Sequence, residues 1–389
     1  MKLLNGIKVL DLTRLLPGPL LTLFLADLGA EVIKIEDTEQ GDYLRWMSAL
    51  DNTSEDTSGA LFNALNRDKK AIRLNLKTPE GKEIFKTLST HADLIVDGFR
   101  PGVMDKLGVG YNDIAKINES IIYCSITGYG MDGPYADRAG HDLNYMGIAG
   151  ILGVAGDDKK PAIPGVQIGD IGGGSITAFG AIMLGLYHKQ KTGKGLYLDI
   201  SMVDGLISFI AAYLPYIKTG IRRGEMELTG SIPCYNIYKT KDNKFITIAA
   251  LEPKFWSRFA EMVHREDLVD RQFAKGEEFT KVYSEVQDIF MTKTRAEWVA
   301  FFEGNDVCVE PVNELDELLD DPHINHRAMF GYVETDGGKS ITIMNPFYRQ
   351  KGTELPKRAP QPGEHTVEIL KKAGYSDKQI DRFKQKGVI

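Results

Sequence analysis

The stretch IKVLDLTRLLPGPLLTLFLADLGAEVIKIED, residues 7–37, decides the fold. Residues 7–13 are apolar and rich in β-branched side chains, which is typical of a buried strand. Residues 17–30 begin with proline and end around Gly29, which are the start and stop signals expected of a helix. Residues 31–37 read as a second apolar strand. A strand, a helix and a strand within about thirty residues form a βαβ unit, which predicts a parallel sheet.

The same alternation continues through the N-terminal half. Strands are expected at AIRLNLK (71–77), DLIVDGF (93–99) and IIYCSITGYG (121–130), with a helix from about Pro79 to His91 between the first two. No GxGxxG opens the first helix, so the usual dinucleotide fingerprint is missing. After Gly174 we expect a buried helix of small apolar residues, then a strand from Leu196 that runs into another buried helix.

The pattern of predicted elements changes at about Gly230, from alternating strands and helices to a hairpin followed by charged helices. NIYKTKDNKFITIAAL (236–251) predicts an antiparallel hairpin that turns at residues 241–244. Charged helical segments follow, such as EEFTKVYSEVQDIFMTK and RAEWVAFFE. We therefore expect a second, smaller domain here.

The composition narrows the class of protein. The chain has 389 residues, of which 43% are hydrophobic and 26% charged, as in soluble globular proteins of about two domains. The net charge of −7, without a basic stripe, argues against a nucleic-acid partner. No apolar run approaching the ~20 residues of a membrane span, and no signal peptide, is expected. Cys124, Cys234 and Cys308 form no CxxC pair, so we expect no metal site, no disulfide framework and a cytoplasmic location.

Three side chains that can carry protons stand in unusual surroundings: His141 in GHDLNY, Asp170 in IGDIGGGS and Glu252 in ALEPKF. Two bases, with a carboxylate to pair with the imidazole, are what a reversible proton transfer at carbon needs. Glycines at a helix start let a ligand approach the backbone, and the N–H of Asp170 is our candidate donor to a developing oxyanion. Each residue also has a plain structural reading, as a structural histidine, a helix N-cap and a surface glutamate. Arg100, in the loop DGFRPGVMDKLG, is either a surface residue or a phosphate contact.

The motifs occur in a fixed order with recognisable flanks, including LDLTRLLPGP, LADLGAEVIKIE, VDGFRPGVMDKLG, CSITGYGMDGP, RAGHDLNY, GDIGGGS, TGKGLYLDISMVDG, ALEPKFW, VCVEPV and DPHINHR. On these segments the chain resembles the family III CoA-transferase and racemase superfamily, and is most similar to its α-methylacyl-CoA racemases. The resemblance implies an α/β fold with a Rossmann-like large domain, a parallel sheet and a smaller α+β domain. It further implies an interlocked homodimer. The expected boundaries are 1–200 for the N-terminal part of the large domain, 201–229 for a linker helix, 230–318 for the small domain and 319–389 for a return segment that completes the large domain.

The resemblance also assigns roles. His141 and Asp170 match the two catalytic bases, and Glu252 matches the glutamate that pairs with the histidine, supplied by the partner subunit. The implied CoA contacts are Leu74, Asn75, Leu76, Lys77, Arg100, Gly140, Asp142, Leu143, Asn144 and Tyr145. No metal is implied, and no cofactor beyond the CoA moiety of the substrate. The racemases commonly carry Asp-Arg-Pro where this chain has Glu36-Asp37-Thr38, and Lys34 and Arg45 are the candidates to replace the missing arginine.

Three activities are compatible with these residues. The first is the interconversion of (R)- and (S)-2-methylacyl-CoA thioesters through an enolate, an isomerase reaction of fatty acid and lipid metabolism. The second is CoA transfer between carboxylic acids through an aspartyl-CoA intermediate at Asp170. The third is a non-catalytic carrier of CoA esters, which would have no need of all three ionisable residues. The sequence leaves the acyl group open.

Overall fold

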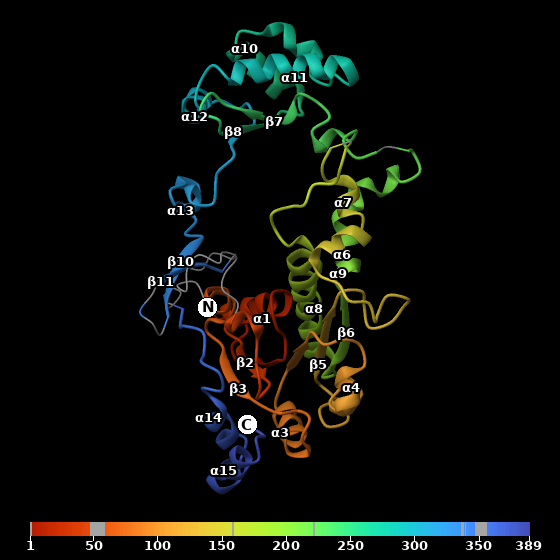
Figure 1. Ribbon diagram of the computed structural model, residues 1–389, viewed down its shortest axis with the longest axis vertical. Helices are drawn as coiled ribbons and strands as arrows, with labels where there is room; N and C mark the ends of the chain where they lie inside the picture. Colours follow the sequence, from red (N-terminus) through yellow and green to blue (C-terminus); the bar gives the residue numbers. More distant parts are fainter. Residues whose placement is uncertain are drawn as a thin grey trace. The chain divides into compact units, whose positions relative to one another are not determined.

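The computed structural model describes residues 2–46, 59–157, 159–220, 222–335, 338, 340–346 and 356–389. The chain separates into two compact units (Figure 1). The first contains Met1–Ala149, Val166–Phe209 and Pro322–Ile389, and the second contains Gly150–Gly165 and Ile210–Asp321. Residues 201–229, expected as one linker helix, are thus divided between the units, and 150–165 joins the second unit.

A six-stranded parallel sheet forms the centre of the first unit. Its strands are β1 (Lys8–Asp11), β2 (Glu31–Glu36), β3 (Lys70–Arg73), β4 (Leu94–Asp97), β5 (Ile122–Thr127) and β6 (Leu196–Ser201). The order β3-β2-β1-β4-β5-β6 places β1 and β4 side by side at the point where the chain reverses its direction across the sheet. The parallel sheet predicted from the sequence is confirmed, and such a reversal opens a crevice at the carboxyl ends of the two strands.

Helices cover both faces of this sheet. Leu10, Ile33 and Ile95 pack on one face in a core shared with α3 (Pro79–Ser89), α14 (Thr366–Lys372) and α15 (Asp377–Gln385). Side chains alternate along a strand, so Asp11 faces the other side, where it accepts a hydrogen bond from Thr22 of α1 (Pro17–Asp27). The C-terminal segment is joined to β3 through the N–H of His365, which donates to the carbonyl of Ala71 at 2.9 Å.

Beside β5 and β6 runs one continuous helix. It begins as a π-helix, η3 (Gly169–Ile176), and continues as α8 (Thr177–Thr192). Its 24 residues are long and apolar enough to cross a bilayer by length and composition, so the expectation that no apolar run approaches that length is wrong. A helix at the core of a protein passes the same test, and α8 packs against β5 and β6. It is only partly buried, because Ile176 and Leu184 are 54% and 71% exposed.

The second unit contains an antiparallel sheet of β7 (Tyr235–Lys239), β8 (Phe245–Ala249) and β9 (Val309–Pro311). The predicted hairpin is present, and Asn243 occupies the left-handed backbone region at its turn, with φ +63°. A core that includes Trp256, Phe259, Phe290 and Trp298 joins the sheet to the helices α10 (Pro253–Met262), α11 (Gly276–Phe290) and α12 (Arg295–Phe302).

The remaining elements are short. They are α2 (Ala60–Asn66), α4 (Val103–Leu107), α5 (Tyr111–Ile114), α6 (Asp142–Ile148), α7 (Ile151–Val154), α9 (Met202–Ile207), α13 (Pro322–His326), β10 (Phe330–Glu334) and β11 (Ser340–Met344), with single 3-10 segments at Tyr43–Arg45, Ser208–Tyr216, Glu227–Thr229, Glu266–Arg271 and Glu317–Leu319.

Candidate active site at the switch point of the sheet

A pocket of about 340 Å³ lies where the loops after β1, β4 and β5 converge, and we call it the switch-point pocket. Its ionisable and phenolic lining includes Arg14, Arg100, Arg138, His141, Tyr145 and Asp170. The lining contains three arginines and a single carboxylate, an excess of positive charge that suits an anionic ligand. Five of the residues singled out from the sequence, namely Gly140, His141, Tyr145, Asp170 and Arg100, meet here.

Asp170 is the carboxylate of this pocket. It is the second residue of η3 and not an N-cap, since the cap position is Ile168. Burial and, to a smaller extent, the charge of Asp142 raise the pKa of Asp170, and the charge of His141 lowers it, which leaves the pKa at about 6. A carboxyl group with this pKa exists in both protonation states near neutrality, as an acid–base catalyst requires.

The candidate oxyanion donor predicted from the sequence is already occupied. The backbone N–H of Asp170 donates to Oδ1 of Asp142 at 2.9 Å. Asp142 therefore holds the backbone beside the Asp170 carboxylate and does not line the pocket. Asn144 has a similar supporting position, because its Oδ1 accepts a hydrogen bond from the N–H of His141 at 3.0 Å. Leu143 is 43% exposed and also lies outside the pocket lining.

The glycines of IGDIGGGS are needed for close helix packing. A Cβ on Gly173 would collide with the carbonyl oxygen of Met202 in α9, and a Cβ on Gly172 would lie 2.5 Å from the ring of Phe209. Both glycines are buried. The expectation that they open the backbone to a ligand is therefore wrong for these two positions, because α9 and its continuation occupy that space.

Tyr145 closes one side of the pocket. Its hydroxyl donates to the carbonyl of Gly140 at 2.5 Å, and its ring lies against Gly128 and Gly140, where an added Cβ would overlap it. Burial raises the pKa of Tyr145 to about 12, with a further contribution from the charge of Asp170. The glycine of the GHDLNY motif is thus explained by contact with the tyrosine of the same motif.

A buried ionic network holds the loop between β1 and α1, which borders the pocket. Asp11 and Lys69 form one fully buried ion pair, with 3.3 Å between Oδ2 and Nζ. Lys34 and Asp42 form a second, at 2.8 Å. Lys34 also donates to the carbonyl of Thr13 at 2.9 Å, which fixes the start of the loop. Burial lowers the pKa of Lys69 to about 7 against the opposing charge of Asp11.

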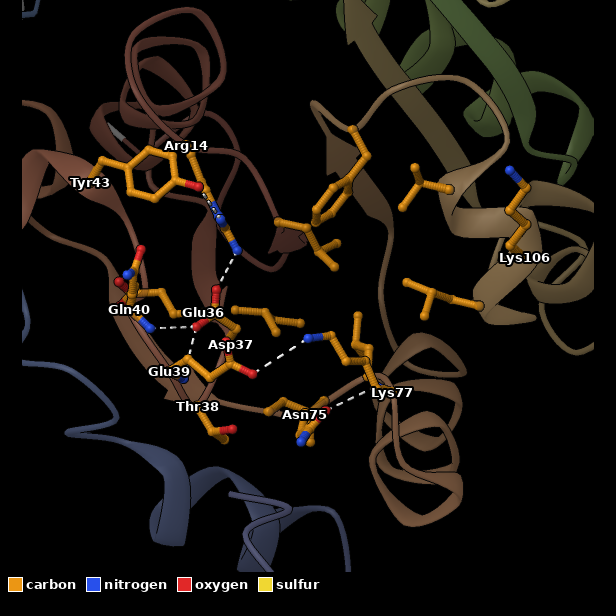
Figure 2. Close-up of a pocket in the computed structure, with 17 residues that line it drawn as sticks. Arg14, Glu36, Asp37, Thr38, Glu39, Gln40, Tyr43, Asn75, Lys77 and Lys106 are labelled. Atoms are coloured by element: carbon orange, nitrogen blue, oxygen red, sulfur yellow. Dashed lines mark hydrogen bonds and ion pairs between the residues drawn. The ribbon is translucent and has the colours of Figure 1, made fainter.

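A second pocket, of about 480 Å³, lies beyond the ends of β2 and β3, and we call it the side pocket. Leu74, Asn75, Leu76 and Lys77 line it, as do Arg14 and Phe99, which also line the switch-point pocket. Figure 2 shows Arg14 and Tyr43 along one side and Lys77 with Asn75 along another. The two pockets are therefore neighbours, with Arg14 and Phe99 bordering both.

Neither candidate for the missing arginine is available in the side pocket. Lys34 is buried in the network described above. Arg45 donates to both carboxylate oxygens of Glu36, at 2.8 and 2.6 Å, and its guanidinium lies 3.7 Å from the ring centre of Phe62. The cations that line the pocket are instead Arg14, Lys77 and Lys106.

Sequence reasoning had missed Arg14 and Lys106. Arg14 directly follows the first predicted strand, and ligands bind at the carboxyl ends of such strands, so its position was a usable signal. Lys106 is an exposed residue of α4, and no pattern in the sequence indicated that it would line a pocket.

Glu252 lies in the second unit, at the N-cap position of α10. Its pairing with His141 stays a prediction.

Comparisons with known proteins identify the family of the chain. A family model described as CoA-transferase family III matches residues 4–366. The chain is 35% identical to succinyl-CoA:glutarate CoA-transferase of Homo sapiens over 100% of this chain and 90% of that protein. It is 33% identical to alpha-methylacyl-CoA racemase of Mus musculus, covering 97% of this chain and 95% of that protein. The crystal structure of a CAIB/BAIF family protein from Brucella suis superposes with a TM-score of 0.80 at 29% identity, over 95% of this chain and 99% of that one. The chain therefore belongs to CoA-transferase family III, the superfamily that its sequence motifs indicated.

Proposed function

We propose that this protein interconverts the two epimers of a 2-methylacyl-CoA thioester by exchanging the proton on the α-carbon. The observation that carries the proposal is that His141 and Asp170 line the same pocket and interact electrostatically. Epimerisation through a planar enolate needs one proton acceptor and one proton donor. A histidine and a carboxyl group with a pKa of about 6 fill these roles near neutral pH.

In one direction, His141 takes the α-proton as the C–H bond breaks, and the electron pair passes to the thioester oxygen. Protonated Asp170 then delivers a proton to the opposite face of the enolate, which forms the new C–H bond. The pair ends with its proton on His141 and a charge on Asp170. The other epimer uses the same steps in reverse, so protons and charges balance.

The developing oxyanion requires a hydrogen-bond donor other than the N–H of Asp170. The donors among the residues that line the switch-point pocket include the guanidinium groups of Arg100 and Arg138, which can stabilise a developing oxyanion. One such donor typically lowers a barrier by about 3 kcal/mol.

CoA would occupy both pockets, with its nucleotide in the side pocket and its thioester in the switch-point pocket. Leu74 to Lys77 would contact the nucleotide, and Arg14 and Arg100 would face the phosphates. The volumes of the two spaces and the three arginines that line the switch-point pocket support this placement.

Glu252 would orient His141 from the partner subunit of an interlocked homodimer. Exposed apolar side chains on the long helix support an assembly of this kind, since Ile176, Leu184 and Tyr187 are 54%, 71% and 60% exposed.

The alternative function is CoA transfer, with the Asp170 carboxylate as nucleophile. Similarity to succinyl-CoA:glutarate CoA-transferase favours it, because that protein is 35% identical over the whole chain. The transferase needs a carboxylic acid acceptor and forms an acyl-enzyme that is sensitive to hydroxylamine. It assigns no proton-transfer step to His141.

The deciding experiment incubates one epimer of a 2-methylacyl-CoA with the protein in D₂O without a carboxylic acid. Deuterium at the α-carbon together with the second epimer supports epimerisation. His141→Ala should abolish both, while His91→Ala, a change to an exposed histidine just after α3 and outside both pockets, should leave both unchanged. Absence of exchange, followed by CoA transfer once succinate is added, would replace the proposal with the alternative.

A further inference from the structure

Asp37 places a fixed carboxylate in the side pocket. Its Oδ1 accepts hydrogen bonds from the backbone N–H groups of Glu39, Gln40 and Gly41, at 2.8, 2.8 and 3.1 Å. Its Oδ2 lies 2.5 Å from the guanidinium of Arg14. Burial opposes ionisation, but these hydrogen bonds and the charge of Arg14 lower the pKa of Asp37 overall. The carboxylate is therefore charged and held in position at neutral pH.

The charges of the side pocket nearly cancel. Its lining contains three cations, Arg14, Lys77 and Lys106, and three carboxylates, those of Glu36, Asp37 and Glu39, of which Glu36 is paired with Arg45 outside the lining. Two of the cations already have acidic partners in the pocket, since Lys77 lies 3.4 Å from Glu39 and Arg14 pairs with Asp37 (Figure 2). Such a pocket has little free positive charge to offer a third phosphate group.

The place of Asp37 in the fold gives its carboxylate a specific partner. Asp37 directly follows the last residue of β2, and in nucleotide-binding parallel sheets a carboxylate near the end of the second strand accepts a hydrogen bond from a ribose hydroxyl. A hydroxyl can donate to Asp37, whereas a phosphate at the same ribose carbon cannot donate and is repelled by it.

Building on the proposed function, we infer that Asp37 is a specificity residue that removes most of the benefit of the 3′-phosphate of CoA. CoA and 3′-dephospho-CoA bind the protein with dissociation constants within about threefold of each other. The substrate class of the enzyme is thus widened to acyl thioesters of 3′-dephospho-CoA.

The test measures binding of CoA and of 3′-dephospho-CoA by calorimetry to the unaltered protein and to Asp37→Asn. Asparagine keeps an oxygen for the three backbone N–H groups and removes the charge. Release of Arg14 changes the affinity for both ligands, because both contain the diphosphate, so the informative quantity is the ratio of the two dissociation constants. We expect the preference for CoA to rise about tenfold in the variant.

Asp93→Asn is the matched control. Asp93 also accepts a backbone N–H and pairs with a lysine, Lys189, but it lies outside the side pocket, so the ratio should not change. A strong preference for CoA in the unaltered protein, or a ratio that Asp37→Asn leaves unchanged, would refute the inference and leave the proposed function intact. Failure of the unaltered protein to bind either ligand would instead overturn the proposed function.

Discussion

Replacing Asp170 with asparagine should stabilise the folded protein above pH 6, although it removes the proposed catalytic acid–base group. Burial, and then the charge of Asp142, raise the pKa of Asp170 from 3.8 to about 6. The folded state therefore resists ionisation of this carboxyl group more than the unfolded chain does. Asparagine has a similar shape and carries no charge, so the variant avoids that penalty.

The size of the effect follows from linkage. One pKa unit corresponds to about 1.4 kcal/mol, so the shift sets an upper value of about 3 kcal/mol. Asp170 is only partly buried, and screening by solvent reduces the expected gain to about 1–2 kcal/mol. Because the folded pKa is the higher one, the penalty is absent below pH 3.8, where the group is protonated in both states. It grows as the pH rises toward about 6 and is constant above that value.

The assay is urea unfolding of the unaltered protein and of Asp170→Asn at pH 5, 6.5 and 8, at one protein concentration. The difference in the free energy of unfolding should increase between the first and last conditions. Asp37→Asn provides a control of opposite sign, because the pKa of Asp37 is lowered and its amide variant should lose stability above pH 4. If Asp170→Asn were no more stable than the unaltered protein at pH 8, the reasoning about its burial would be wrong.

Three further predictions concern the surroundings of the site. Asp142→Asn should move the acid limb of kcat/KM toward lower pH, because the Asp142 charge contributes to the raised pKa of Asp170; an unmoved limb would count against this coupling. Gly173→Ala should destabilise the protein by at least about 2 kcal/mol in urea unfolding, whereas Gly153→Ala in α7, with nothing within 4 Å of the added Cβ, should be neutral or stabilising. Asp11→Ala leaves the buried Lys69 without its counter-ion and should cost about 3–5 kcal/mol; a loss below 1 kcal/mol in the same assay would show that the network is dispensable.

The sequence was sufficient for the parts of the fold that depend on local pattern. Apolar β-branched runs alternate with helices that have clear start and stop signals, and the first βαβ unit contains all of these signals within residues 8–36. The sequence predicted a buried helix at α8, because apolar residues lie on all sides of most of its length, whereas the structure leaves one side of it exposed. The exposure of Leu184 depends on what covers the outer side of the helix, and periodicity contains no such information.

The candidate site was predictable in its residue types but not in its hydrogen bonds. His141 and Asp170 lie in one pocket, as their motifs indicated. The link from the Asp170 N–H to Asp142 joins residues 28 positions apart and depends on how η3 and α6 pack. Likewise, Lys34 and Arg45 looked available until the structure showed each beside a buried carboxylate. Charge counts along a chain do not reveal which charges are already paired.

The pH dependence of the reaction distinguishes the two candidate activities, because they need different protonation states of one pair. In epimerisation, His141 and Asp170 together hold one exchangeable proton at the start and one at the end, first on Asp170 and then on His141, or the reverse. It should therefore fail when both groups are protonated and when neither is, which gives a bell-shaped kcat/KM with an acid limb near pH 6. The bell must be the same for both epimers, because their equilibrium constant does not depend on pH. CoA transfer needs only the ionised Asp170 carboxylate, so its rate should rise with pH and then stay constant. If kcat/KM for epimerisation by the unaltered protein rose through its acid limb and then stayed constant up to pH 9, this result would argue against the two-base mechanism, even if some α-proton exchange were detected.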